Sequence, residues 1–66
     1  MHGNYMKTIK IRHCTPGMMV SPTYDQMHLK RNTAYMILED IKYVLKLGSY
    51  ELIRYYGHEI VEIISV

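Results

Sequence analysis

The sequence predicts a small α+β domain: one antiparallel sheet built from an N-terminal and a C-terminal hairpin, with a helix at about residues 34–47. Three observations lead to this prediction. Apolar and polar residues alternate near residue 9, a longer periodic segment follows residue 33, and the last residues are rich in isoleucine and valine. A chain of 66 residues has room for a single small domain, so residues 1–66 are treated as one unit.

The N-terminal hairpin is predicted from two short segments and the turn between them. Ile9 and Ile11 alternate with polar residues, which indicates a half-buried strand over residues 7–13. Residues 15–17 read Thr-Pro-Gly, a combination typical of turns. The mostly apolar run 18–21 then predicts the second strand of the hairpin.

Pro22 closes this second strand and places it at the edge of the sheet, because proline cannot donate a hydrogen bond to a neighbouring strand. Residues 23–33 are polar and charged, and we expect a loop with a weak strand at about residues 27–30. Met6 resembles a second start site, so we expect residues 1–5 to be disordered or dispensable.

The helix is predicted from Ala34–Leu47, the longest periodic segment. Asn32 can cap its start and Gly48 can end it. Two strands joined at Glu39–Asp40 are the alternative, which gives an all-β small barrel of five or six strands, but two acidic residues make a poor hairpin loop. The apolar residues that share one helical face are Ala34, Ile37, Leu38, Ile41, Val44 and Leu45.

The C-terminal hairpin is predicted from residues 51–56 and 59–66, with its turn at Gly57. Residues 60–61 and 63–64 are apolar at successive positions, so both faces of the strand 60–66 carry apolar residues. Such a strand belongs in the middle of a sheet or pairs with another chain. The sequence therefore also permits a homodimer that forms through Ile60–Val66.

Residue patterns that carry catalysis or metal binding are missing from the sequence. His13 and Cys14 are adjacent, which on a strand sends them to opposite faces, and the paired spacing of a zinc site is absent. We therefore expect no enzyme activity, no metal and no cofactor. The longest apolar run, Ala34–Leu38, is too short to cross a membrane. A single cysteine fits a reducing compartment, which favours the cytoplasm.

The aromatic composition points to binding. All seven aromatic residues are tyrosines, and there are six methionines, and both residue types are enriched at protein interfaces. Tyr55 and Tyr56 are adjacent, so one of them should point outward. We predict a compact non-enzymatic inhibitor, of the kind that phages and mobile elements encode, which occludes the functional surface of a partner protein such as a nucleic-acid-processing protein. The predicted contact residues are Tyr24, Lys30, Arg31, Tyr35, Lys42, Tyr43 and Lys46.

Two other functions use the same basic residues. The first is binding of single-stranded nucleic acid, with phosphates on Lys10, Arg12, Lys30 and Arg31 and bases stacked on tyrosines. The net charge of +2 is low for such a protein. The second is a sponge that sequesters an anionic nucleotide at a dimer interface.

Overall fold

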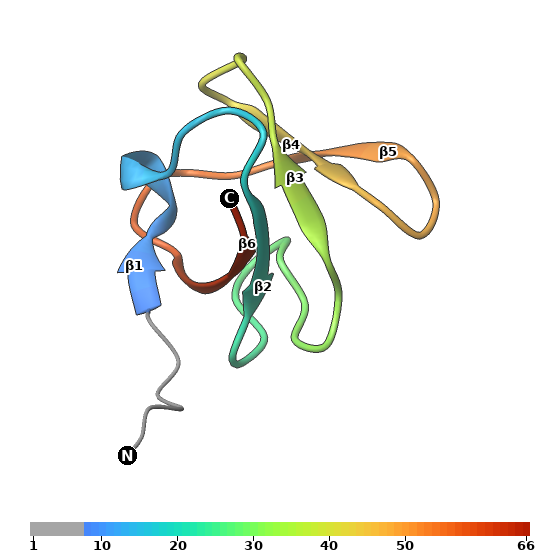
Figure 1. Ribbon diagram of the computed structural model, residues 1–66. Coiled ribbons are helices and arrows are strands. Elements are labelled where there is room, and N and C mark those ends of the chain that lie inside the picture. Colours follow the sequence, from blue (N-terminus) through green and yellow to red (C-terminus); the bar gives the residue numbers. More distant parts are fainter. Residues whose placement is uncertain (1–7) are drawn as a thin grey trace.

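The computed structural model describes residues 8–66, which form a six-stranded antiparallel sheet (Figure 1). Its strand order is β1-β6-β2-β3-β4-β5. Residues 1–5, which we expected to be dispensable, lie outside the described range. The elements are β1 (Thr8–Lys10), the 3-10 helix η1 (Ile11–His13), β2 (Met19–Pro22), β3 (Tyr35–Ile37), β4 (Tyr43–Lys46), β5 (Glu51–Arg54) and β6 (Ile60–Ser65).

The predicted helix at residues 34–47 is wrong, because this segment forms β3 and β4. Ile41, assigned to the buried helical face, is 80% exposed in the connection between the strands. That connection spans residues 38–42, which is long enough to avoid the special backbone angles of a two-residue loop. The carboxylate of Asp40 accepts the backbone N–H of Lys42 at 2.7 Å and stabilises the turn. The all-β alternative with six strands is consistent with the structure.

Both predicted hairpins are also wrong. At the N-terminal side, β6 lies between β1 and β2, so β1 and β2 do not pair. At the C-terminal side, β5 pairs with β4 at the far edge of the sheet and does not contact β6 as a strand. Nor is β2 an edge strand, since it pairs with β6 and β3, and Pro22 occupies its last position. These pairings join segments that are distant in sequence.

The first strand is shorter than predicted. It ends at Lys10, and the chain then turns into η1, which buries Ile11 in the core. The backbone N–H of Ile11 donates to the carbonyl of Glu59 at 2.8 Å, and that of Cys14 donates to the carbonyl of Ile11 at 3.0 Å. The 3-10 helix η1 therefore takes the place of residues 11–13 of the predicted strand, and it buries Ile11.

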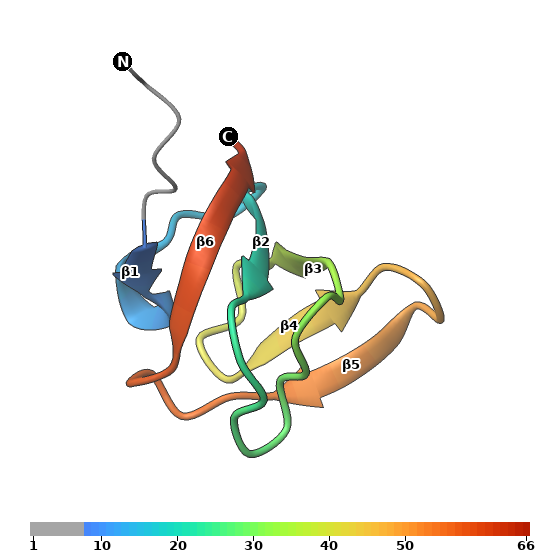
Figure 2. The same ribbon diagram turned by 90° about the horizontal axis from the view of Figure 1, so that it is seen from below.

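The prediction that the last strand is central is confirmed. β6 runs between β1 and β2 (Figure 2), with Ile9 opposite Val61 on one side and Val20 opposite Ile63 on the other. Val61 is fully buried, and its partner Ile9 projects from the same face of the sheet. The inner face of β6 therefore needs apolar residues. β1 pairs with residues 60–62 of β6, and β2 pairs with residues 61–63 and with Ser65. A homodimer through Ile60–Val66 stays a prediction.

The segment between β2 and β3 is a loop, as predicted, but the weak strand at residues 27–30 is not present. A single bridge joins Gln26 to Leu29 around a tight turn, and Leu29 is buried in the core. The amide of Gln26 also donates to the carbonyl of Ile60 and accepts its backbone N–H, both at 2.8 Å. One side chain thus ties this loop to the start of β6.

The segment that links β5 to β6 is held by a buried carboxylate. Glu59 is 1% exposed and accepts the backbone N–H of Tyr56 at 2.9 and 3.1 Å and that of Gly57 at 2.8 Å. Gly57 has a φ of +110°, in the region that favours glycine, and an added Cβ would lie 3.6 Å from that of Arg12. These contacts let the chain cross from the edge of the sheet back to its middle.

The core lies on the inner side of the curved sheet and includes Tyr35, which is 1% exposed. Its hydroxyl accepts the backbone N–H of Lys30 at 2.9 Å, so it also fixes the loop before β3. The remaining buried apolar residues are Ile11, Val20, Leu29, Ile37, Val44, Tyr55 and Val61.

We predict that Tyr35→Phe lowers the free energy of unfolding by about 1 kcal/mol, because the N–H of Lys30 loses its partner. Tyr35→Ala should cost about 3–5 kcal/mol through the cavity it leaves. Urea unfolding measures both values. Tyr43→Phe is the matched control, for which we expect little change. An equal loss in the two phenylalanine variants would contradict the structural role of the Tyr35 hydroxyl.

Candidate functional site

Four apolar residues form a row across the outer face of the sheet. Met19 lies opposite Met36, Met36 opposite Leu45, and Leu45 opposite Leu52. Because cross-strand partners project from the same face, all four side chains lie on one side of strands β2 to β5. Adjacent strands are about 4.8 Å apart, so the row is about 14 Å long. We call these four residues the outer row.

The outer row is unusual because the solvent face of an antiparallel sheet is normally polar. The outer positions of β1 follow that rule, with Thr8 and Lys10, whereas those of β6 are mixed, with Glu62 between Ile60 and Ile64. The inner neighbours of the outer row fill the core, so its own residues are not needed there. Leu52 is 61% exposed, and the other three residues are half-buried.

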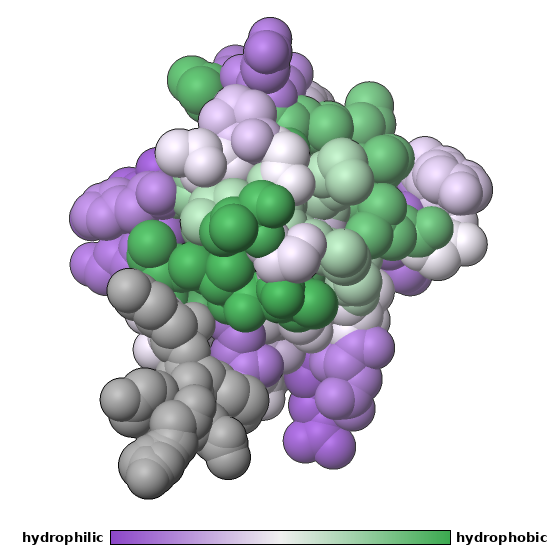
Figure 3. Space-filling view, in the orientation of Figure 1, coloured by the Kyte–Doolittle hydropathy of each residue, from purple (hydrophilic) through white to green (hydrophobic). Residues whose placement is uncertain are grey.

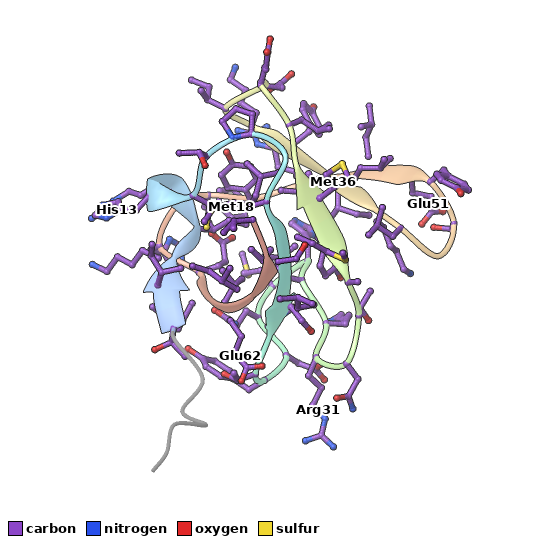
Figure 4. All side chains as sticks on the ribbon, viewed as in Figure 1. His13, Met18, Arg31, Met36, Glu51 and Glu62 are labelled. Atoms are coloured by element: carbon purple, nitrogen blue, oxygen red, sulfur yellow. The ribbon has the colours of Figure 1, made fainter. Side chains whose placement is uncertain are left out.

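Apolar residues gather across the centre of this side of the molecule, over β2, β3 and the end of β6, with polar residues at the rim (Figure 3). Met36 lies on β3 near the middle of the same view, whereas His13 and Arg31 extend from its margins (Figure 4). Ile64 is exposed at the end of β6. Tyr43 precedes Leu45 by two residues and therefore shares its face.

Tyr50 adds an exposed aromatic ring next to β5. It is 76% exposed and has a φ of +60°, in the left-handed region that a bulky residue rarely adopts. Asparagine or glycine would fit this turn with less strain. The ring therefore occupies a position that folding alone does not favour.

The seven predicted contact residues do not come together on one surface. Tyr35 lies in the core and is not available to a partner in this structure, because the helix that was expected to expose it is absent. Tyr43 is half-buried on the outer face of β4, at its first position, and Lys46 is half-buried at its last position. Lys42 is exposed in the turn before β4, at the opposite end of β3 from the loop after β2 (Figure 1). That loop exposes Tyr24, Lys30 and Arg31.

An open pocket of about 390 Å³ lies between η1, the turn before β4 and the segment after β5. Arg12, Cys14, Asp40 and Tyr55 contribute to its lining. Burial raises the pKa of the Cys14 thiol, which keeps the thiol protonated and weakly nucleophilic at neutral pH. Burial, and next the negative charge of Asp40, raise the pKa of Tyr55.

The outer row was not predicted from the sequence, although a signal for it was present. In β2, β3 and β4, apolar residues occupy both phases of the alternation, which leaves an apolar residue on each face of the strand. The helical interpretation of residues 34–47 hid this signal, because it placed Leu45 on the buried side. The prediction for the adjacent tyrosines is confirmed: Tyr55 is buried, whereas Tyr56 is 49% exposed.

Comparison with known proteins gives no relative: no protein-family model, no curated protein and no solved structure matches the chain. Among residues 8–66, no helix is long and apolar enough to cross a membrane. The same residues contain no group of three His, Cys, Asp or Glu side chains placed to hold a metal ion.

We predict that the raised pKa of Tyr55 makes the protein less stable at alkaline pH. The unfolded chain releases the phenol proton near the ordinary pKa of 10.0, whereas the folded protein holds it to higher pH. The contribution of the Tyr55 phenol to the free energy of unfolding is therefore complete below the pKa of the unfolded chain, and it is lost as the pH rises through the pKa of the folded protein. Urea unfolding from about pH 9 to about pH 11 should show a smaller loss of stability for Tyr55→Phe than for wild type. If the stability of both proteins falls equally between these pH values, the raised pKa of Tyr55 is contradicted.

Proposed function

We propose that this protein is a binding protein without catalytic activity, and that its outer row inserts into an apolar groove of a partner protein and occludes it. The observation that supports this most directly is the row itself: four apolar side chains in register on a face that folding leaves free. Contiguous exposed apolar surface on a small protein is typical of an interaction site.

The shape of the sheet indicates which kind of partner fits. The core fills the inner side of the curved sheet, so the outer row lies on the convex side (Figure 2). Two convex faces touch over a small area, which disfavours a second copy of this chain as the occupant. A groove with an apolar floor encloses the same row from both sides and excludes more water.

The residue types of the surface support adaptable binding. Met19 and Met36 have flexible, polarisable side chains that repack against different shapes. Tyr43 shares the outer face of β4, and Tyr50 is exposed in the turn before β5; aromatic rings contribute large contact areas with few rotatable bonds. The basic residues Lys30 and Arg31 extend from the loop after β2, where they can attract an acidic partner during the encounter. We place this activity in the cytoplasm because the single cysteine needs no oxidising compartment.

We predict that a photo-crosslinking amino acid at position 52 captures a partner protein from an extract of the source cells, whereas the same group at position 8 does not. Position 8 is the matched control, because Thr8 is exposed on the polar part of the sheet. In the chain without the crosslinker, Leu52→Lys should weaken binding to the captured protein by about tenfold to a hundredfold, the effect of removing one buried leucine. Thr8→Lys adds the same charge and should leave affinity unchanged.

Three results would contradict the proposal: equal capture from both positions, crosslinks only to a second copy of the chain, and crosslinks to lipid. Thermal unfolding of both lysine variants checks that neither loses the fold. Since Leu52 is largely exposed, we expect both midpoints to stay close to that of wild type.

We further predict that Tyr50→Asn raises the thermal midpoint and weakens partner binding. Asparagine tolerates the left-handed backbone at this position, which relieves about 1 kcal/mol of strain, and it removes the ring from the contact surface. Calorimetry and titration of the captured partner measure the two effects. Higher stability with unchanged affinity would show that the ring does not contact the partner.

A further inference from the structure

A second surface, which adjoins the outer row where Arg54 lies opposite Tyr43, gathers aromatic rings and one guanidinium around Tyr56. The guanidinium carbon of Arg54 lies 5.6 Å from the centroid of the Tyr56 ring. The ring of His58 stacks on it at 6.3 Å with an interplanar angle of 21°. His28 approaches from the loop after β2, with its ring centroid at 5.8 Å and its Nε2 at 3.4 Å from the Tyr56 hydroxyl. We call these four residues the Tyr56 cluster, and all four are exposed.

Two buried or half-buried polar side chains hold the Tyr56 cluster in place. The carboxylate of Glu59 fixes the backbone of Tyr56 and Gly57, so the ring is held where the chain leaves β5. The amide of Gln26 fixes the loop that carries His28 to the backbone of Ile60. Two segments that are distant in sequence are thereby locked against each other at the point where their aromatic rings meet. A surface group that is oriented in this way loses little conformational entropy on binding.

The charge of the Tyr56 cluster favours an anionic ligand. It contains one permanent cation, Arg54, and two histidine rings that can donate hydrogen bonds. Two carboxylates near its members accept backbone N–H groups: Glu59 those of Tyr56 and Gly57, and Asp25 that of Arg31 at 2.9 Å. The exposed guanidinium of Arg54 lies over the Tyr56 ring, where it can bind a phosphate while the rings offer π-faces to a base.

We propose that the Tyr56 cluster binds single-stranded nucleic acid, with a base stacked against its rings and a backbone phosphate on Arg54. A guanidinium beside aromatic rings matches one base and its neighbouring phosphate in an unpaired strand. A duplex buries its bases and offers only the phosphates. A free nucleotide has the same chemistry as one unit of the strand, so the test must separate the two.

The test is fluorescence anisotropy of a labelled single-stranded DNA or RNA of about a dozen nucleotides, titrated with the full chain. Tyr56→Ala should weaken binding between about fivefold and about a hundredfold, the effect of losing one stacked base. Tyr56→Phe keeps the ring and should bind like wild type. Arg54→Gln should make the slope of log affinity against log salt shallower by about 0.7, because one phosphate contact is lost.

Tyr24→Ala and Arg31→Gln are the matched controls, since both residues are exposed outside the cluster. Thermal unfolding of each variant checks the fold, and Tyr56→Phe keeps the test valid if the alanine variant unfolds. Four results would overturn the proposal: no binding of either strand, equal losses in Tyr24→Ala and Tyr56→Ala, equal affinity for a duplex of the same sequence, and displacement by a mononucleotide at concentrations similar to those of the strand. The outer row is intact in the Tyr56 variants, so these results do not depend on the protein partner proposed above.

Discussion

The fold depends on the buried carboxylate of Glu59. β5 lies at one edge of the sheet and β6 near the other, so the segment between them must cross the end of the core. A crossing segment has backbone N–H groups that no strand can pair, and unpaired groups in a buried place are costly. Glu59 accepts those of Tyr56 and Gly57, and its own carbonyl accepts the N–H of Ile11. One residue thus joins the start of η1 to the crossing segment, and both of its buried carboxylate oxygens accept hydrogen bonds.

The same crossing segment determines where the candidate sites lie. By carrying the chain from β5 to the place between β1 and β2, it leaves β5 at the edge, where Leu52 ends the outer row. It also turns Tyr56 outward while Tyr55 faces the core. The two proposed surfaces are therefore consequences of one backbone path. They share β5, with Leu52 in the outer row and Arg54 in the Tyr56 cluster.

The sequence predicted some local features correctly and the long-range pairing of the strands incorrectly. The alternation around Ile9, the turn at Pro16 and Gly17 and the central place of the last strand depend on neighbouring residues, and each is seen in the structure. Which strands pair is decided by contacts such as that of Gln26 with Ile60, between residues 34 positions apart, and no local pattern encodes these. For this reason both hairpins were predicted between neighbours in sequence.

The helix error had a different cause, and it also misplaced the site. Residues 34–47 are apolar at both helical and strand spacings, so periodicity alone cannot distinguish the two. What decides the outcome is that Tyr35, Ile37 and Val44 fill one core that other strands complete. Once the segment is read as two strands, Met36 and Leu45 fall on the free face and Tyr35 on the inner one. A candidate surface derived from the wrong period therefore selects a core residue.

The central position of β6 also constrains how the chain folds as it leaves the ribosome. Among the described residues, β1 pairs with β6 alone, and β2 needs β6 along one edge. Translation proceeds at about 5–20 residues per second, so the open edge of β2 waits on the order of seconds for its partner. During that time the nascent chain exposes an unpaired, apolar strand edge to other polypeptides. The sheet can close only after nearly all of its strands have been synthesised, which makes folding a late and cooperative event.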